Sequence, residues 1–214
     1  MTTLVLASAS PARLETLRRA GVEPTVIVSD VDEDAALAAE RARHQASGTT
    51  LSPADAVLAL ARVKAESVAA LAEVADSVVL GCDSMLELDG EIFGKPASAY
   101  VAIERWRAMR GNEGLLHTGH WVVDASASGP GFGRTATTRV RFADLGDAEI
   151  EAYVATGEPL RVAGGFTVDG LGGPYVTSIE GDYHNVVGLS LPLLRELLAQ
   201  IHIEWHSLRS GSGL

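Results

Sequence analysis

Cysteine, lysine, aromatic residues and long apolar runs are all scarce in this sequence of 214 residues. The single cysteine, Cys82, cannot form an internal disulfide, and the N-terminus lacks the basic, apolar and small segments of a secretory signal. The best apolar run, 77–80, is far shorter than the roughly 18 residues that span a bilayer. With 47% apolar and 21% charged residues, the composition is that of a globular rather than a disordered chain. We therefore expect a soluble, cytoplasmic protein without a membrane partner.

Positive charge is also scarce, and this limits the class of ligand. The formal net charge is −11, so the chain is not expected to bind nucleic acid, because an extended phosphate backbone needs a basic face. A small anionic ligand needs only a few cations that converge locally. Of the 17 basic residues only Lys64 and Lys95 are lysines. Nucleotide bias in the genome explains why lysine is rare, but the two that remain suggest places where a compact ammonium is required.

Strand and helix signals alternate in the first third of the chain. A serine followed by proline marks a helix start twice, at Ser10 and Ser52, and Gly21 is typical of a helix end. The expected elements are a strand at 3–7, a helix from Pro11 to Gly21, a strand at 24–28, an acidic turn at 29–34 and an amphipathic helix from Pro53 to Leu71.

Hairpins interrupt this alternation in the rest of the chain. The expected elements are a strand at 77–81 ending at Cys82 and Asp83, a hairpin of 85–88 and 91–93 around Asp89 and Gly90, a helix from Ser98 to Gly111, strands at 115–124 and 134–143, a helix capped by Asp147 and a last helix opened by Ser190 and Pro192. The fold class is therefore α/β with a mixed sheet. We expect one domain over 1–206 and a frayed tail over 207–214.

The turn after the first strand is a candidate anion site. Ser8 and Ser10 precede a helix whose free N–H groups and dipole favour a phosphate, and Arg13 lies one turn into that helix. Helix capping alone is the commoner role for Ser10.

Acidic residues give two further candidates. The cluster at 30–34, which includes Glu33, is either a solvated loop or a source of oxygen ligands for Mg²⁺. Asp83 follows a buried strand, where open α/β sheets place ligands, although an aspartate there can also cap a turn. Spacing alone does not decide between these interpretations.

The two lysines lie in distinctive settings. Lys95 is held between Gly94 and Pro96 after the hairpin, where it is either a solvated loop lysine or a point charge for a phosphate. Lys64 lies beside the apolar stripe of the second helix, so its ammonium either extends to solvent or meets an anion.

Common catalytic motifs are missing from the sequence. The glycine-rich segment 163–173 has neither the dinucleotide nor the Walker A spacing, so it is a flexible loop or a place of close approach to a ligand. No zinc spacing and no G-x-S-x-G motif occur. Carboxylates are the only plausible ligands for a metal.

Seven segments, in order and spacing, resemble the Maf family of nucleoside triphosphate pyrophosphatases, also called septum formation inhibitor proteins. They are SASPARLETL at 8–17, SDVDE at 29–33, LARVKAESVA at 60–69, GCDSM at 81–85, FGKP at 93–96, AGGFTVDGLGG at 163–173 and GDYHNVVGLSLPLL at 181–194. The resemblance covers nearly the whole chain. It implies a mixed, elongated, twisted sheet flanked by helices, with two lobes around a central cleft, as in Maf and ITPase-like folds.

The resemblance also implies an activity and its residues. A nucleoside triphosphate would be cut between its α and β phosphates with Mg²⁺ or Mn²⁺, and the family leads us to expect a homodimer. The implied roles are proton acceptor for Asp83, metal ligands for Glu33 and Asp83, catalytic and phosphate contact for Lys64, substrate contacts for Ser8, Ser10, Arg13 and Lys95, and a place in the base-selecting region for Asp169.

Two departures from the family pattern leave the substrate open. Ala12 stands where family members often carry an arginine, and Asp169 stands where Gln or Glu is common. The choice among pyrimidine, 7-methylguanosine and other modified triphosphates is therefore unresolved. Two other functions share these features: a nucleotide-binding regulator of cell division with weak or no catalysis, and a nucleotidyltransferase, which needs an acceptor.

Overall fold

A computed structural model describes residues 3–127 and 129–209. The chain divides into two compact units, each assembled from separate stretches. Unit 1 consists of Met1–Asp83, Thr118–Ala136 and Gly188–Leu214, and unit 2 of Ser84–His117 and Thr137–Val187. Three strands contribute to both units: β3 (Ser77–Leu88), β5 (Glu113–Asp124) and β6 (Phe132–Phe142).

Unit 1 is built on parallel pairing around β1 (Thr3–Leu6). This strand pairs in parallel with β2 (Thr25–Val26) and with β3, so that Leu6 lies opposite both Val26 and Leu80. The strand order in this unit is β2-β1-β3-β5-β6. Ser8, just after β1, therefore lies at the carboxyl edge of a parallel strand, where α/β sheets place ligands.

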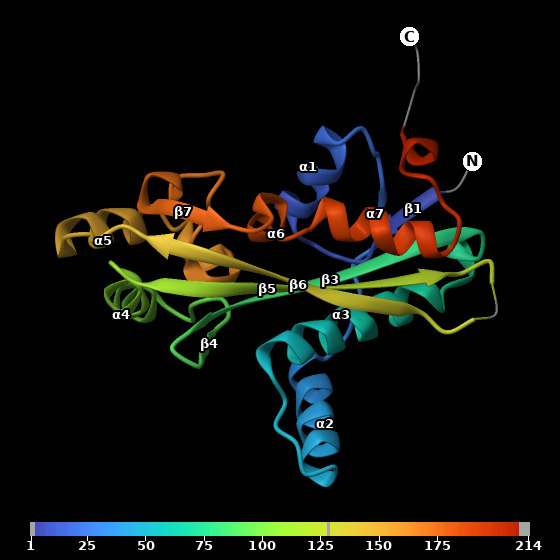
Figure 1. Ribbon diagram of the computed structural model, residues 1–214, viewed down its shortest axis with the longest axis horizontal. Coiled ribbons are helices and arrows are strands. Elements are labelled where there is room, and N and C mark those ends of the chain that lie inside the picture. The colour runs from blue at the N-terminus through green and yellow to red at the C-terminus, as the bar shows by residue number, and fades with distance from the viewer. Residues whose placement is uncertain (1–2, 128, 210–214) are drawn as a thin grey trace. The chain divides into compact units, whose positions relative to one another are not determined.

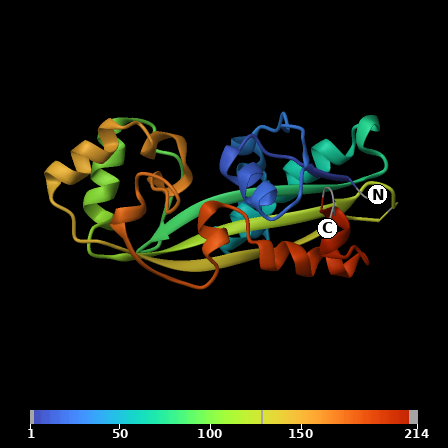
Figure 2. The ribbon, with the colours of Figure 1, turned by 90° about the horizontal axis from the view of Figure 1, so that it is seen from above.

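Helices cover both faces of β1 and of the first part of β3, which is why these two stretches are apolar and buried on both sides. One face carries Leu4, Leu6, Val78 and Leu80 and packs against α1 (Pro11–Arg19) and α7 (Leu191–Gln200). The opposite face carries Val5 and Val79 and packs against α3 (Pro53–Ala69). In Figure 1, α1 and α7 lie on one side of these strands and α3 lies on the other. Figure 2 views the strands from the side that α1 (blue) and α7 (red) cover.

The expected helix starts are confirmed by their capping bonds. The hydroxyl oxygens of Ser10, Ser52, Ser98 and Ser190 each accept a hydrogen bond from the backbone N–H three residues later. In each case this satisfies one of the free donors of the first turn.

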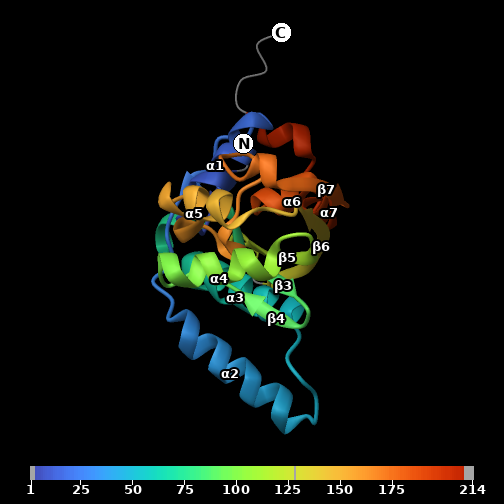
Figure 3. The same cartoon turned by 90° about the vertical axis from the view of Figure 1, so that its left-hand side faces the viewer.

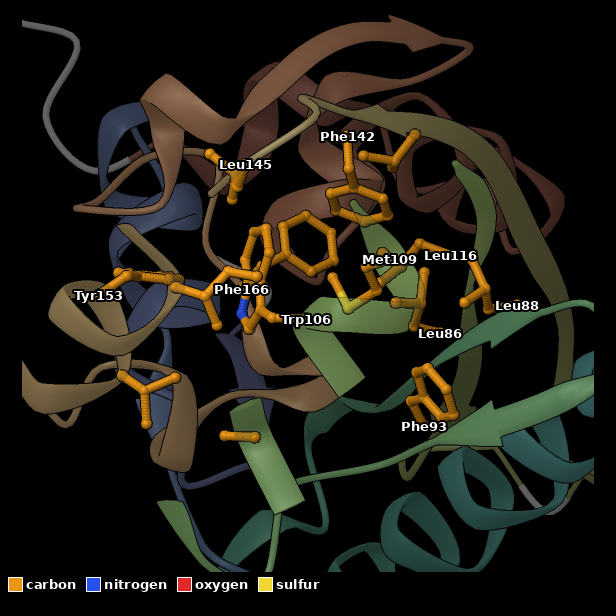
Figure 4. Packing of buried hydrophobic residues seen from close by; sticks show 14 of the residues in the cluster. Leu86, Leu88, Phe93, Trp106, Met109, Leu116, Phe142, Leu145, Tyr153 and Phe166 are labelled. Carbon is orange, nitrogen blue, oxygen red and sulfur yellow. The ribbon is translucent and has the colours of Figure 1, made fainter. Parts of the chain in front are cut away.

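Unit 2 has its own core on a single face of the strands. Helices α4 (Ala99–Met109) and α5 (Asp147–Ala155) pack against this face. At the centre, the rings of Trp106 and Phe142 meet edge to face, with their centroids 5.7 Å apart (Figure 4). The strands β4 (Glu91–Phe93) and β7 (Val176–Glu180) pair antiparallel with β3 and β6. Because β1 pairs in parallel while β4 and β7 pair antiparallel, the predicted mixed sheet is confirmed.

The predicted hairpin turn is also confirmed. Asp89 and Gly90 have φ of 49° and 83°, the two positive values that a type I′ turn requires.

Several predicted boundaries are wrong. The predicted turn at 29–34 leads instead into helix α2 (Glu33–Ala46), capped by Asp32. The strand predicted to end at Cys82 and Asp83 continues to Leu88, so it is one strand with the predicted strand at 85–88. The cap of α5 is Gly146, so Asp147 is its first residue.

Other elements are absent from the sequence expectations. The strand β7, the helix α6 (Tyr183–Val187) and five short 3₁₀ turns, η1 (Ala72–Val74), η2 (Pro159–Arg161), η3 (Ala163–Gly165), η4 (Gly173–Tyr175) and η5 (Trp205–Leu208), were not predicted. The η5 turn overlaps the first two residues of the predicted tail, and Leu208 is buried in the core of unit 1. Residues 210–214 of that tail lie outside the described residues.

No helix among the described residues is both long enough and apolar enough to cross a membrane.

The thiol of Cys82 is predicted to be unreactive in the folded protein. Its side chain is fully buried, and burial raises its pKa to about 12, so almost no thiolate forms near neutral pH. A thiol reagent at pH 8 should modify the unfolded chain at one group per molecule and leave the native protein unmodified. Rapid modification of the native protein would contradict this placement of the β3 strand.

Candidate functional site

A buried lysine joins two carboxylates from different elements of unit 1. The Nζ atom of Lys64, on α3, lies 2.6 Å from Oδ1 of Asp83 on β3 and 2.8 Å from Oε1 of Glu33 on α2. Lys64 is only 8% exposed. An ammonium so far from water needs anionic partners, and the two carboxylates supply them.

Two glycines allow α3 to lie directly on the strands. A Cβ atom on Gly81 would come within 2.1 Å of the carbonyl oxygen of Ala61, and one on Gly119 within 2.3 Å of that of Val57. Ala61 is three residues before Lys64 in α3, and Gly81 is two residues before Asp83 on the same face of β3. Because glycine has no Cβ at these two positions, α3 lies close to the strands and the ammonium of Lys64 reaches Asp83.

Glu33 reaches the same ammonium from the first turn of α2. Its side chain is 52% exposed, whereas that of Asp83 is 13% exposed. The site thus has one enclosed carboxylate and one that faces solvent. The sequence cluster at 30–34 contributes Glu33 to the site, while Asp32 is a helix cap.

Burial raises the pKa of the Asp83 carboxyl above its ordinary value. The positive charges of Lys64 and Arg13 act in the opposite direction, and the negative charge of Glu33 reinforces the increase. Desolvation disfavours the charged form of a carboxyl, so Asp83 holds a proton more readily than an exposed aspartate. This is a property of a candidate general base.

Arg13 lies near the Asp83 carboxyl and donates hydrogen bonds to three separate segments of unit 1. Its Nη1 donates to the hydroxyl of Ser8 and to the carbonyl of Cys82, both at 2.9 Å, and its Nε donates to the carbonyl of Gly188 at 2.8 Å. Ser8 also accepts from the N–H of Ser10, whose own hydroxyl caps α1. The turn predicted to bind an anion is therefore held in shape by Arg13.

Lys95 and Asp169 belong to unit 2, and both are exposed. Lys95 takes part in no ion pair among residues 3–127 and 129–209, a setting that differs from that of Lys64. The roles that the sequence analysis gives to Lys95 and Asp169 remain predictions.

The glycine-rich segment around Asp169 is built around a glutamate that the sequence analysis missed. The carboxylate of Glu158 accepts hydrogen bonds from the hydroxyls of Tyr153 and Thr167 and from the N–H groups of Leu171 and Gly172, at 2.6 to 3.1 Å. Glu158 thus holds the middle of this segment at Thr167 and its far end at Leu171 and Gly172. The only sequence signal is an acidic residue shortly before a glycine-rich stretch.

Replacing Glu158 with Gln is predicted to lower the free energy of unfolding by about 1–2 kcal/mol, because an amide cannot accept all four hydrogen bonds. The loss is no larger because the side chain is partly exposed to water. Burial raises the pKa of Glu158, but its hydrogen bonds outweigh burial and hold it below the ordinary value. The contribution should therefore be present at neutral pH and be lost as the pH falls through the lowered pKa. Denaturant unfolding at pH 7 and pH 3, with the exposed Glu151→Gln as control, tests this, and equal stability of both variants at pH 7 would refute it.

The acidic residues of the site suit a hard divalent ion in part. Two carboxylates are a common donor set for Mg²⁺ or Mn²⁺, which otherwise use water and substrate phosphates. Within 3–127 and 129–209, no three His, Cys, Asp or Glu side chains are grouped to hold a metal alone. Glu33 and Asp83 therefore fit an ion whose remaining ligands come from a phosphate-bearing substrate.

Of the sequence-predicted residues, the structure brings together Ser8, Ser10, Arg13, Glu33, Lys64 and Asp83 in unit 1. Sequence reasoning missed Gly81 and Gly119, since nothing in the sequence shows that a helix crosses there.

Comparison with known proteins gives matches over nearly the whole chain. A family model described as Maf-like protein matches residues 3–201. The nucleoside triphosphate pyrophosphatase of Leifsonia xyli subsp. xyli is 51% identical over 215 residues, which cover 99% of this chain and 98% of that protein. The protein of the same name from Streptomyces coelicolor is 54% identical over 198 residues, covering 92% and 90%.

Among solved structures, the Staphylococcus aureus Ham1 protein is similar over 97% of this chain and 94% of that chain, with 14% identity and a TM-score of 0.44. That likeness is too distant to bear on function.

Proposed function

The chain belongs to the Maf-like protein family, and from this we propose that it is a nucleoside triphosphate pyrophosphatase, which hydrolyses its substrate to a nucleoside monophosphate and pyrophosphate. Relatives of that name share about half of its residues over nearly their full length. The observation that carries the proposal is the buried ammonium of Lys64 in contact with both Asp83 and Glu33.

The proposed mechanism assigns proton transfer to Asp83. The attacking water gives its proton to the Asp83 carboxylate, the side chain whose raised pKa suits a base. Lys64 donates to this carboxylate at 2.6 Å, which fixes its orientation and places a positive charge beside the reacting phosphate. No covalent intermediate is required.

Two other groups support this step. Ser8 and the first turn of α1 present a hydroxyl and a helix N-terminus, which favour binding of a phosphate oxygen. Glu33 and Asp83 would hold a divalent ion, whose chemistry at this position is to neutralise charge on phosphate oxygens.

A panel of natural and modified nucleoside triphosphates with Mg²⁺ or Mn²⁺ tests the proposal. Pyrophosphate and nucleoside monophosphate should appear in equal amounts with at least one member of the panel. Binding of a triphosphate without any pyrophosphate would favour a regulatory protein. Pyrophosphate that appears only after an acceptor is added would favour a nucleotidyltransferase.

A further inference from the structure

The helix α2, which carries Glu33, has little apolar packing, since Leu37 is only partly buried. None of its 14 residues is buried, and Leu37 is its single large apolar side chain. Figures 1 and 3 show it extending away from α3 and the strands of unit 1. A short helix in water is marginal unless tertiary contacts hold it, so the contacts that α2 does make decide where Glu33 lies.

A second contact between α2 and α3 is an ion pair in the middle of α2. The side chain of Glu40 is only 16% exposed, and its Oε2 lies 3.5 Å from Nη2 of Arg62 on α3. It also lies 2.7 Å from Nη1 of Arg43, one turn further along α2. The guanidinium of Arg62 lies over the ring of Trp121 on β5, 5.9 Å from its centroid. Arg62 is thus held between a carboxylate of α2 and an aromatic ring of the sheet.

The pair of Glu40 with Arg62 and the pair of Glu33 with Lys64 join the same two helices, α2 and α3. Glu40 is seven residues after Glu33, about two turns and roughly 10 Å along α2, so both carboxylates face the same side. Arg62 is two residues before Lys64 in α3. The two helices are therefore joined by ion pairs at two points, Glu33 with Lys64 and Glu40 with Arg62.

We infer that Glu40 and Arg62 are positioning residues that hold Glu33 beside Lys64 and Asp83 without touching substrate. The ion pair of Glu33 with Lys64 lies at the first turn of α2, and Glu33 is 52% exposed, so this pair alone does not fix the rest of the helix. The second contact stops α2 from swinging about its first turn. The consequence for catalysis rests on the proposed function, in which Glu33 holds the divalent ion.

The test compares Glu40→Gln, Arg62→Met and the double variant with Glu15→Gln, which breaks an exposed ion pair with Arg19 within α1. In metal-free protein, amide hydrogen exchange over residues 36–46 should become several-fold faster in the Glu40 and Arg62 variants and stay at the parent rate in Glu15→Gln. The concentration of Mg²⁺ that gives half-maximal pyrophosphate release should rise about 10-fold, with turnover at saturating Mg²⁺ retained. Because the pair acts as a unit, the exchange rate of α2 and the Mg²⁺ concentration for half-maximal activity should be no higher in the double variant than in either single variant.

Unchanged exchange in α2, an unchanged Mg²⁺ requirement, or additive effects in the double variant would overturn the inference. A parent protein that releases no pyrophosphate would refute the proposed function instead, and the exchange rates would still show whether Glu40 and Arg62 hold α2.

Discussion

Replacing Asp83 with Asn is expected to lower the turnover of nucleoside triphosphates by on the order of 10²-fold or more, which is the usual scale for loss of a general base. Asn has the same shape as Asp, so it fills the same space between β3 and α3. It cannot take a proton from water at neutral pH. Lys64 keeps Glu33 as a partner, and the fold should persist.

Steady-state rates of pyrophosphate release and thermal unfolding curves measure this effect. The matched control is Asp76→Asn, an exposed carboxylate just before the same strand. Its rate should equal that of the parent protein. If Asp83→Asn also keeps the parent rate, another group is the base and the assignment of Asp83 is wrong.

The substitution Gly81→Ala is expected to disrupt the site without changing any polar group. The added Cβ would lie 2.1 Å from the carbonyl oxygen of Ala61 and 2.8 Å from the backbone nitrogen of Ala65, so α3 must move away from β3. Overpacking of this kind costs about 1–3 kcal/mol of stability, and more where backbone atoms clash. Since Lys64 moves with α3, turnover should fall by roughly 10²-fold, the effect of a displacement of about 1 Å in an active site.

Unfolding by denaturant and pyrophosphate release should both be measured for this variant. The control is Gly129→Ala, because a Cβ at Gly129 meets no atom within 4 Å. Parent-like stability and turnover in Gly81→Ala would show that close packing of α3 on β3 does not set the position of Lys64.

The predictable parts of the fold are those with strong local signals. Ser-Pro pairs marked the starts of α1 and α3, and Asp-Gly marked the hairpin turn, because each reports a specific backbone requirement. Helix α2 has neither a Ser-Pro start nor the helical spacing of apolar residues that marks a buried face. It buries no residue, so it has no apolar stripe, and its only marker was Asp32 as a capping residue.

Several candidate residues that the sequence indicates meet in unit 1, but their geometry could not be predicted. Only two lysines occur in the chain, and one of them, Lys64, lies on an apolar helix face, which indicated a special role for it. Glycines 81 and 119 have no local pattern, and their effect depends on which helix crosses the strands. Glu158 was missed for the same reason, since its four donors come from four separate positions of the chain.

Analysis of the reaction products by ³¹P NMR tests the central claim most directly. With an accepted triphosphate and Mg²⁺, the parent protein should yield nucleoside monophosphate and pyrophosphate in a ratio of one to one, and Asp83→Asn should leave the triphosphate almost intact over the same time. Release of nucleoside diphosphate and orthophosphate, or equal product formation by the two proteins, would contradict the account.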